Sequence, residues 1–264
     1  MVAPLVPRSG TLLENRFLNR LGPSNGPLQS YLKRFASHSS RYFRDDFEGD
    51  AINLDNYALG NGAGSGAVAF AVVAQEGGAI DGICGTANGV TASQSLIMPI
   101  TWYGDRNCGV EFIFKPSSIE EIKMEFGLID AVPASTTAAV NNHTTPTFYA
   151  ADAAVMYYNK TSSTVVNGFY TVGSTTDMPD DADAITSTIS ATVWNRVRVQ
   201  LWGNNAACWL NGLLVAVKDN DAVGFVEGGV ALSPWIYVRA NSATSKTLSV
   251  DQIEAWSDRP ALVA

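Results

Sequence analysis

One stretch of the sequence constrains the fold more than any other: residues 193–202, VWNRVRVQLW, and the run CWLNGLLV at 208–215. Side chains on a β-strand alternate between two faces, so the valines of the first run would share one face and its two arginines the other. Asn211-Gly212 lies between two β-rich runs, a pattern typical of a two-residue hairpin turn. The stretch predicts antiparallel strands joined by tight turns and requires no helix.

The same strand-and-turn pattern extends over most of the chain. Residues rich in Val, Ile, Thr and aromatic side chains recur between clusters of Gly, Pro, Asn and Asp, which favours an all-β sandwich of two antiparallel sheets. The expected strands are 67–74, 96–101, 109–115, 119–128, 147–158, 165–173, 193–202, 207–217, 229–239 and 247–256. We expect residues 134–145 and 177–183 to be surface loops.

Charge divides the chain into two parts. Residues 1–44 contain seven basic residues against one acid, a net charge of +6, whereas the remainder has ten basic and 24 acidic residues, a net charge of −14. A basic arm on an acidic body usually meets a partner of its own. The alternative is that the arm folds back onto its own acidic domain. We therefore divide the chain into an arm, 1–44, and a body, 45–264.

The arm has the pattern of two short helices. Thr11 to Glu14 form a capping box, apolar residues follow at helical spacing to Leu21, and a second apolar stripe runs from Leu28 to Phe35. Helices this short are marginal alone in water, so they need a surface on which to pack. The candidate partner-binding residues of the arm are Arg8, Arg16, Phe17, Arg20, Tyr31, Lys33, Arg34, Phe35 and Arg41.

Four motifs of the body occur in a family-like order: FRDDFEGD at 43–50, FGLID at 126–130, the strand and WLNG turn of 193–212, and SVDQIEAW at 249–256. Together they resemble the concanavalin A-like lectin/glucanase superfamily. The order of FGLID, then residues 151–158, then the hairpin resembles that of virion proteins of tailed bacteriophages with this fold. The resemblance covers residues 45–256 and leaves out the arm. It implies a jelly-roll sandwich, preceded here by an extended, partly helical N-terminal arm.

Glycosidases of this superfamily carry their carboxylates on one strand as E-x-D-x-E. The chain has Glu121, Lys123 and Glu125 at that spacing, with lysine in place of the middle acid. An ammonium group there would lower the carboxyl pKa that a general acid needs raised. We therefore expect no catalytic residues: these three side chains would form a solvated or subunit-facing side, with Ile122, Met124 and Phe126 in the core. A glycosidase is the alternative.

Other candidate sites have simpler interpretations. The glycine-rich run at 60–66 lacks the lysine of a phosphate-binding loop, so we interpret it as a turn. We expect no metal and no cofactor, although the aspartates at 177, 180, 181 and 183 could ligate Ca²⁺ instead of forming a solvated loop. Cys84, Cys108 and Cys208 are expected to be buried thiols, with a Cys84–Cys108 disulfide as the alternative. Aromatic side chains that could form a carbohydrate-binding platform are Trp102, Tyr103, Trp202, Trp209 and Trp235. We expect them instead in the core or in subunit contacts.

We expect no signal peptide, because the first residues lack a basic flank and a continuous apolar stretch, and no membrane span, because no apolar stretch is long enough. The bases of the arm are spread among apolar residues at helical spacing, which does not favour nucleic acid as a partner. We therefore predict a non-enzymatic virion protein of a tailed phage, made in the host cytoplasm. It would decorate the capsid or attach to the head or tail through its arm, bind capsid or other virion proteins, and form a homo-oligomer. The alternative is a carbohydrate-binding, lectin-like module that attaches to a surface glycan.

Overall fold

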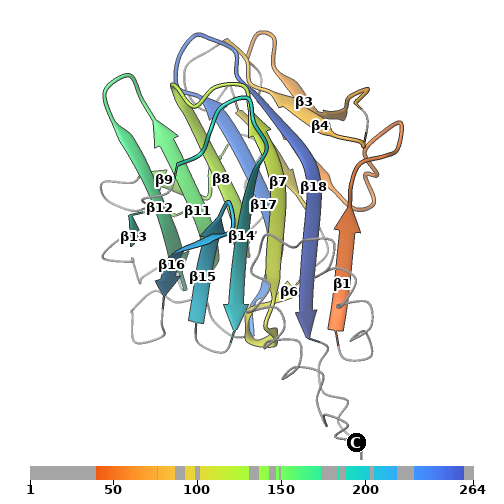
Figure 1. Cartoon of the computed structure of the whole chain (residues 1–264), viewed down its shortest axis with the longest axis vertical. Helices are drawn as coiled ribbons and strands as arrows, with labels where there is room; N and C mark the ends of the chain where they lie inside the picture. Colours follow the sequence, from red (N-terminus) through yellow and green to blue (C-terminus); the bar gives the residue numbers. More distant parts are fainter. Residues whose placement is uncertain are drawn as a thin grey trace, which may run out of the picture.

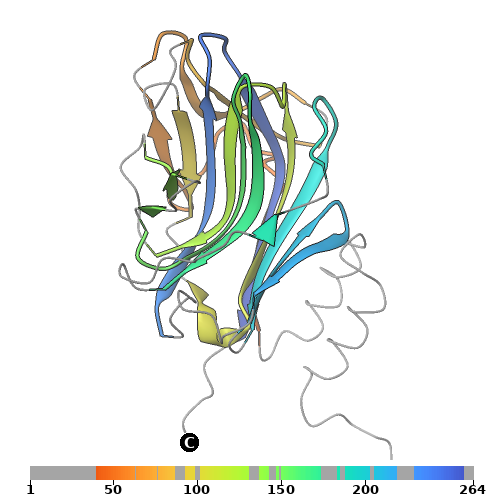
Figure 2. The ribbon, with the colours of Figure 1, turned by 90° about the vertical axis from the view of Figure 1, so that its left-hand side faces the viewer.

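A computed structural model describes residues 40–62, 64–75, 77–86, 93–98, 102–130, 137–142, 147–148, 150–173, 183–184, 188–202, 205–218 and 229–258. These residues form two antiparallel sheets packed face to face, as Figure 2 shows. The predicted all-β sandwich is therefore confirmed. In the described part of the chain the only helical segment is a short 3₁₀ turn, Gly104–Arg106.

We name the two layers sheet A and sheet B. Sheet A has the order β16-β15-β14-β7-β18-β4-β3, and β1 also pairs with β18 (Figure 1). Its strands are β16 (Leu213–Lys218), β15 (Asn205–Leu210), β14 (Asn195–Trp202), β7 (Gly109–Pro116), β18 (Thr247–Asp258), β4 (Ile80–Ile83), β3 (Val68–Val72) and β1 (Ser40–Asp45).

Sheet B has the order β13-β12-β11-β8-β17-β5-β2, and β6 also pairs with β17. Its strands are β13 (Asp183–Ala184), β12 (Val165–Val172), β11 (Ala153–Lys160), β8 (Ile122–Ile129), β17 (Ala231–Ala240), β5 (Ser93–Ile97), β2 (Ala58–Asn61) and β6 (Trp102–Tyr103). A separate pair is formed by β9 (Val140–Asn142) and β10 (Thr147–Phe148).

The main core lies between the two sheets and follows from strand alternation. On β8 the side chains of Ile122, Met124 and Phe126 are fully buried in it, as predicted. Phe126 packs against two phenylalanines of β7 on the opposite sheet, with ring centroids 5.9 Å from Phe112 and 4.2 Å from Phe114. Aromatic contacts between the layers thus fix how β7 and β8 face each other.

The hairpin predicted at Asn211-Gly212 is present. Strand β14 pairs with β15, β15 pairs with β16, and the two turn residues have φ angles of 51° and 88°. Positive φ at both central residues is what a type I′ turn requires, and Asn and Gly adopt it at least cost. The alternation predicted on β14 also holds, since Val197, Val199 and Leu201 lie in the core.

The predicted elements need correction in three places. Residues 40–44, which we assigned to the arm, belong to β1, and they pair along β18 from Ser40 opposite Asp258. The expected strand 147–158 is instead two strands, because β10 pairs with β9 whereas β11 lies in sheet B. The short strands β2 and β4 were not predicted, since four residues carry little periodicity. The rest of the arm, 1–39, lies outside the described residues.

Candidate functional site

The residues that resemble a glycosidase motif lie on the outer face of sheet B, which we define as the face turned away from sheet A. Lys123 and Glu125 alternate along β8 with the core residues Met124 and Phe126, so they point outward. Glu125 stands in register between Tyr157 of β11 and Tyr237 of β17. The strands thus surround the pair of charged groups with aromatic side chains.

A segment of the same chain covers this face. Ala138, Ala139 and Val140 are buried, and they pack in clusters with outward-facing residues of sheet B such as Val155, Trp235 and Tyr157. Lys123 and Glu125 beneath them are only 1% and 0% exposed. The prediction of a solvated or subunit-facing side is therefore wrong for Lys123 and Glu125, whereas Glu121 is half-exposed. The surface loop predicted for 134–145 is likewise wrong at residues 138–140.

The Glu125 carboxylate holds the covering segment in place. Its Oε2 accepts hydrogen bonds from the backbone N–H of Ala139 at 2.7 Å and from Nε1 of Trp235 at 3.1 Å. Its Oε1 accepts one from the N–H of Val140 at 3.1 Å and lies 3.2 Å from Nζ of Lys123. A carboxylate has about four acceptor positions. Glu125 uses all four of them on its own protein.

Lys123 also binds the covering segment, and we call Lys123, Glu125 and their contacts with Ala139 and Val140 the clamp. Its Nζ donates a hydrogen bond to the carbonyl of Val140 and lies 5.1 Å and 5.7 Å from the ring centroids of Tyr157 and Tyr237. Burial lowers the pKa of Lys123, opposed by the Glu125 carboxylate and reinforced by the nearby Arg239. A buried ammonium persists only when it is paired and hydrogen-bonded, and both conditions hold here.

The geometry of Glu121, Lys123 and Glu125 differs from that of a pair of catalytic carboxylates. A retaining enzyme needs two carboxyl groups about 5–5.5 Å apart beside an open cleft. Lys123 occupies the middle position, and Glu125 is enclosed by its own partners. Glu121 precedes β8 with a φ of 50°, and its carbonyl accepts a hydrogen bond from the N–H of Asn241. The positive φ ends the alternation at Glu121, so the three motif residues do not form one carboxylate face.

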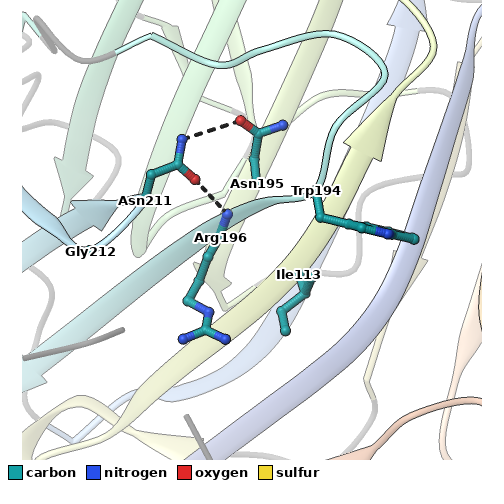
Figure 3. A pocket seen from close by; sticks show the side chains of 6 residues that line it. All are labelled: Ile113, Trp194, Asn195, Arg196, Asn211 and Gly212. Atoms are coloured by element: carbon teal, nitrogen blue, oxygen red, sulfur yellow. Dashed lines mark hydrogen bonds between the residues drawn. The ribbon is translucent and has the colours of Figure 1, made fainter. Parts of the chain in front are cut away.

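A second feature, on the outer face of sheet A, is an open hollow of about 360 Å³ beside the β15–β16 hairpin (Figure 3). It is lined by Ile113, Trp194, Asn195, Arg196, Asn211 and Gly212. Trp194 is 39% exposed, and Nζ of Lys115 lies 4.5 Å from its ring centroid. The hollow therefore presents an accessible indole ring beside a cation.

The two asparagines of the hollow join the β15–β16 turn to the start of β14. Asn211 donates to Oδ1 of Asn195 at 3.2 Å and accepts from the backbone N–H of Arg196 at 2.9 Å, as Figure 3 shows. Asn195 also donates to the carbonyls of Ser190 and Val193. Nε of Arg196 lies 3.5 Å from Oε1 of Glu111. Asn195, Asn211 and Arg196 therefore stabilise the fold, whereas the Trp194 side chain is exposed.

The aromatic lectin candidates do not gather into one platform. Trp102 and Trp235 are buried, so neither can stack on a ligand. Trp202 and Trp209 are half-buried on the outer face of sheet A, with ring centroids 6.4 Å apart, and Arg106 lies over Tyr103. The prediction of core or contact roles is confirmed for Trp102 and Trp235.

All three cysteines are buried and free, so the predicted thiols are confirmed and the Cys84–Cys108 disulfide is absent.

Residues 64–66 form a turn, with Gly66 at a φ of 75°. Within the described ranges no group of three His, Cys, Asp or Glu side chains is placed to hold a metal ion. The aspartates at 177, 180 and 181 lie outside those ranges. No helix of the described part is long and apolar enough to cross a membrane.

Arg41 is the only predicted arm-site residue inside the described ranges. It lies on β1, and its guanidinium carbon is 5.1 Å from the ring centroid of Trp102. The other eight candidates, Arg8, Arg16, Phe17, Arg20, Tyr31, Lys33, Arg34 and Phe35, lie outside them. Sequence reasoning missed the covering segment, whose only signal is the short apolar run Ala138-Ala139-Val140 within a Ser/Thr-rich stretch.

No family model matches the sequence, and no curated protein matches it. Solved structures resemble the fold. A protein of unknown function, SO2946 from Shewanella oneidensis MR-1, aligns with a TM-score of 0.55 at 14% identity over 86% of this chain and 90% of its own. The Emp47p carbohydrate recognition domain aligns at 0.57 and 9% identity over 84% and 98%.

A third structure is Rv0315 of Mycobacterium tuberculosis, described as an immunostimulatory antigen and pseudo β-1,3-glucanase. It aligns with a TM-score of 0.54 at 11% identity over 82% of this chain and 98% of its own. The fold is that of the concanavalin A-like lectins and glucanases. Identities this low show the fold alone, and proteins with this fold include carbohydrate-binding and glucanase-like members.

Proposed function

We propose that this protein is a non-enzymatic structural component of a tailed-phage particle, in which residues 1–39 contact another virion protein and the jelly-roll body projects. The observation that carries the non-enzymatic part is the clamp on sheet B. Glu125 and Lys123 stand at the positions of a catalytic motif, but they form hydrogen bonds with the backbone of Ala139 and Val140 of the same chain. A body built this way supports recognition and assembly rather than hydrolysis.

The particle role is supported by two features of the sequence. The motifs of the body follow the order associated with phage virion proteins of this fold. The segment that precedes β1 carries five basic residues and one acid, whereas the body is acidic. Opposite charges favour the association of such a segment with an acidic partner surface and raise its rate. Capsid or other virion proteins are the partners we propose, with a homo-oligomer as the assembled form.

Particle attachment is tested with the full-length protein and purified particles. In one variant Arg16, Arg20, Lys33 and Arg34 are changed to Ser; in the matched control four exposed or half-exposed bases of the body, Arg44, Arg106, Lys160 and Lys218, are changed likewise. We expect only the arm variant to lose co-sedimentation with particles. Equal co-sedimentation of both variants would remove the basis for an arm-mediated role.

The non-enzymatic part has its own assay. Purified protein incubated with β-1,3-glucan should release no reducing sugar above a buffer blank. Turnover that disappears in a Glu121→Ala variant would refute the proposal and identify a glycosidase. The Glu121→Ala substitution does not touch the buried pair Lys123 and Glu125, because Glu121 is half-exposed and lies before β8.

The second candidate function is saccharide binding at the hollow of sheet A. Its specific support is Trp194, an exposed indole ring of the kind that often marks binding surfaces. The test is a glycan array with wild type and Trp194→Ala, and with Val193→Ala as the control because its side chain is also exposed. Selective binding that is lost only with Trp194→Ala would favour this function over the assembly role.

A further inference from the structure

The outer face of sheet B brings a lysine, a carboxylate and a carboxamide together in a buried position. Strands β8 and β11 are neighbours (Figure 1), and Lys123 stands directly opposite Asn159 in their register. Residues directly opposite each other in an antiparallel pair share a face and have Cβ atoms about 4.5–5.5 Å apart. Lys123, Glu125 and Asn159 are only 1%, 0% and 7% exposed. A nucleophile, an acid–base group and an amide carbon thus lie together away from solvent.

Lys123 has the surroundings of a reactive amine. Its Nζ lies 3.2 Å from Oε1 of Glu125, close enough for direct proton transfer. Burial lowers the pKa of Lys123, opposed by the charge of Glu125, and so favours the neutral amine that attacks carbonyl carbons. Nζ lies 5.1 Å from the ring centroid of Tyr157 on β11 and 5.7 Å from that of Tyr237 on β17. The amine is therefore nearer to the tyrosine on the strand that carries Asn159.

Asn159 has the surroundings of an activated amide. Its Oδ1 accepts a hydrogen bond from Nδ2 of Asn241 at 2.6 Å. The Asn241 amide is held in this orientation, because its Oδ1 accepts from Nε and Nη2 of Arg239 and its Nδ2 also donates to the carbonyl of Lys160. A donor aimed at a carbonyl oxygen stabilises the oxyanion that forms when an amine attacks the carbon. The fold thus supplies Asn159 with an oriented oxyanion donor.

We propose that Lys123 and Asn159 form an isopeptide bond between β8 and β11, with Glu125 as the proton carrier and Asn241 as the oxyanion donor. Nζ of Lys123 attacks Cγ of Asn159, so that the Nζ–Cγ bond forms and the Cγ–Nδ2 bond breaks. Glu125 carries protons from Nζ to the leaving nitrogen. A lysine ammonium group and a carboxamide become an amide and an ammonium ion, so atoms and charges balance without an oxidant or a reductant.

The bond adds a covalent feature to the body and does not depend on attachment to a particle. In the structure Nζ of Lys123 pairs with Glu125, and this is the arrangement from which the reaction starts. Joining residues 123 and 159 closes a loop that contains the covering segment, residues 138–140. Such a link restricts the unfolded chain, as a disulfide does, and so stabilises the folded body. The register of β8 and β11 would be fixed covalently.

The bond is tested by mass spectrometry of the denatured full-length protein. Release of ammonia lowers the intact mass by about 17 Da. Trypsin does not cleave after a linked lysine, and a second protease that cuts before aspartate opens the chain at Asp130 and Asp152. After both digestions, fragments 107–129 and 152–160 should remain joined as one species. Without the bond, trypsin cleaves after Lys123 and the two fragments separate.

Matched variants separate the bond from the packing. Lys123→Arg retains the positive charge but replaces the amine with a guanidinium group that does not attack amides, so this variant should have its full sequence mass. Lys160→Arg changes the lysine next to Asn159 and should still show the loss of ammonia. Asn241→Ala should slow bond formation about 10²-fold, because one oxyanion donor is removed. The slower reaction is measured as a larger unlinked fraction in freshly purified protein.

Three results would overturn the proposal. The first is a wild-type protein with the full sequence mass, a result that needs no variant to fold. The second is a loss of ammonia that persists in Lys123→Arg or maps to another position, such as a succinimide at Asn211-Gly212. The third is a bond that forms at the wild-type rate in both Glu125→Gln and Asn241→Ala, which would refute the roles given to these two side chains.

Discussion

The clamp on sheet B predicts a large and specific loss of stability when Lys123 is changed to Met. Methionine retains most of the side-chain volume but removes the ammonium group that lies 3.2 Å from Oε1 of Glu125. Glu125 then stays buried with an uncompensated charge. Removing one partner of a buried ion pair typically costs about 3–5 kcal/mol, and small domains have only about 5–15 kcal/mol of stability. We expect a loss within the first of these ranges.

The double variant Lys123→Met/Glu125→Gln separates the charge from the packing. It removes both charges, so its loss of stability should be smaller than the sum of the two single losses, with a coupling of about 1–3 kcal/mol. Guanidinium unfolding of all four proteins, followed by tryptophan fluorescence, measures the cycle. A single-variant loss below about 1 kcal/mol, or strict additivity, would show that the two groups do not compensate each other.

The clamp also has a local readout. Because the N–H groups of Ala139 and Val140 donate to Glu125, their hydrogen exchange should accelerate in Lys123→Met more than that of the strands in sheet A. Uniform acceleration over the whole chain would instead indicate global unfolding. It would contradict the view that Lys123 and Glu125 hold residues 138–140 in place.

Three further outcomes follow from the packing. Gly127→Ala should cost about 1–3 kcal/mol of stability in guanidinium unfolding, because its Cβ would lie 2.1 Å from the Ala154 carbonyl oxygen. Gly229→Ala, with open space around it, should be neutral in the same experiment. Asn211→Ala should cost about 1–3 kcal/mol through two lost hydrogen bonds, and equal midpoints would contradict this. Burial raises the pKa of Cys84 and Cys108 from 9.0 to about 12, so their stabilising contribution should be complete below pH 9 and decline as pH rises from 9 to 12. Unfolding midpoints measured across that range check the slope, and fast labelling of native thiols at pH 8 would refute it.

Much of the fold is readable from local patterns. The alternation in 193–202 and the Asn-Gly turn predict β14 to β16, because strand period and turn chemistry act on neighbouring residues. Strand β1 could not be predicted from its charged sequence SRYFRD. These residues form a strand because they pair with β18. The pairing partner is more than 200 residues away, and no local pattern reveals it.

The candidate site shows the same division. Alternation on β8 predicts that Lys123 and Glu125 share a face, which the structure confirms. Whether that face meets water depends on residues 138–140, which come from a Ser/Thr/Ala-rich stretch that reads as a surface loop. Burial of a charged pair is therefore a tertiary property here, set by a segment that the pair itself anchors.

Strand β18 unites the ends of the body: it pairs with β4 and β7 and, over its second half, with β1. Residues 40–45 can therefore find their place only after residues 253–258 have been synthesised. During translation the earlier strands of sheet A emerge with the seam between β7 and β4 still open. Contacts of such high sequence separation slow folding and leave strand edges exposed while the chain waits. A ribosome-bound chain that ends before residue 247 should thus be a substrate for chaperones, whereas the finished body closes its own seam.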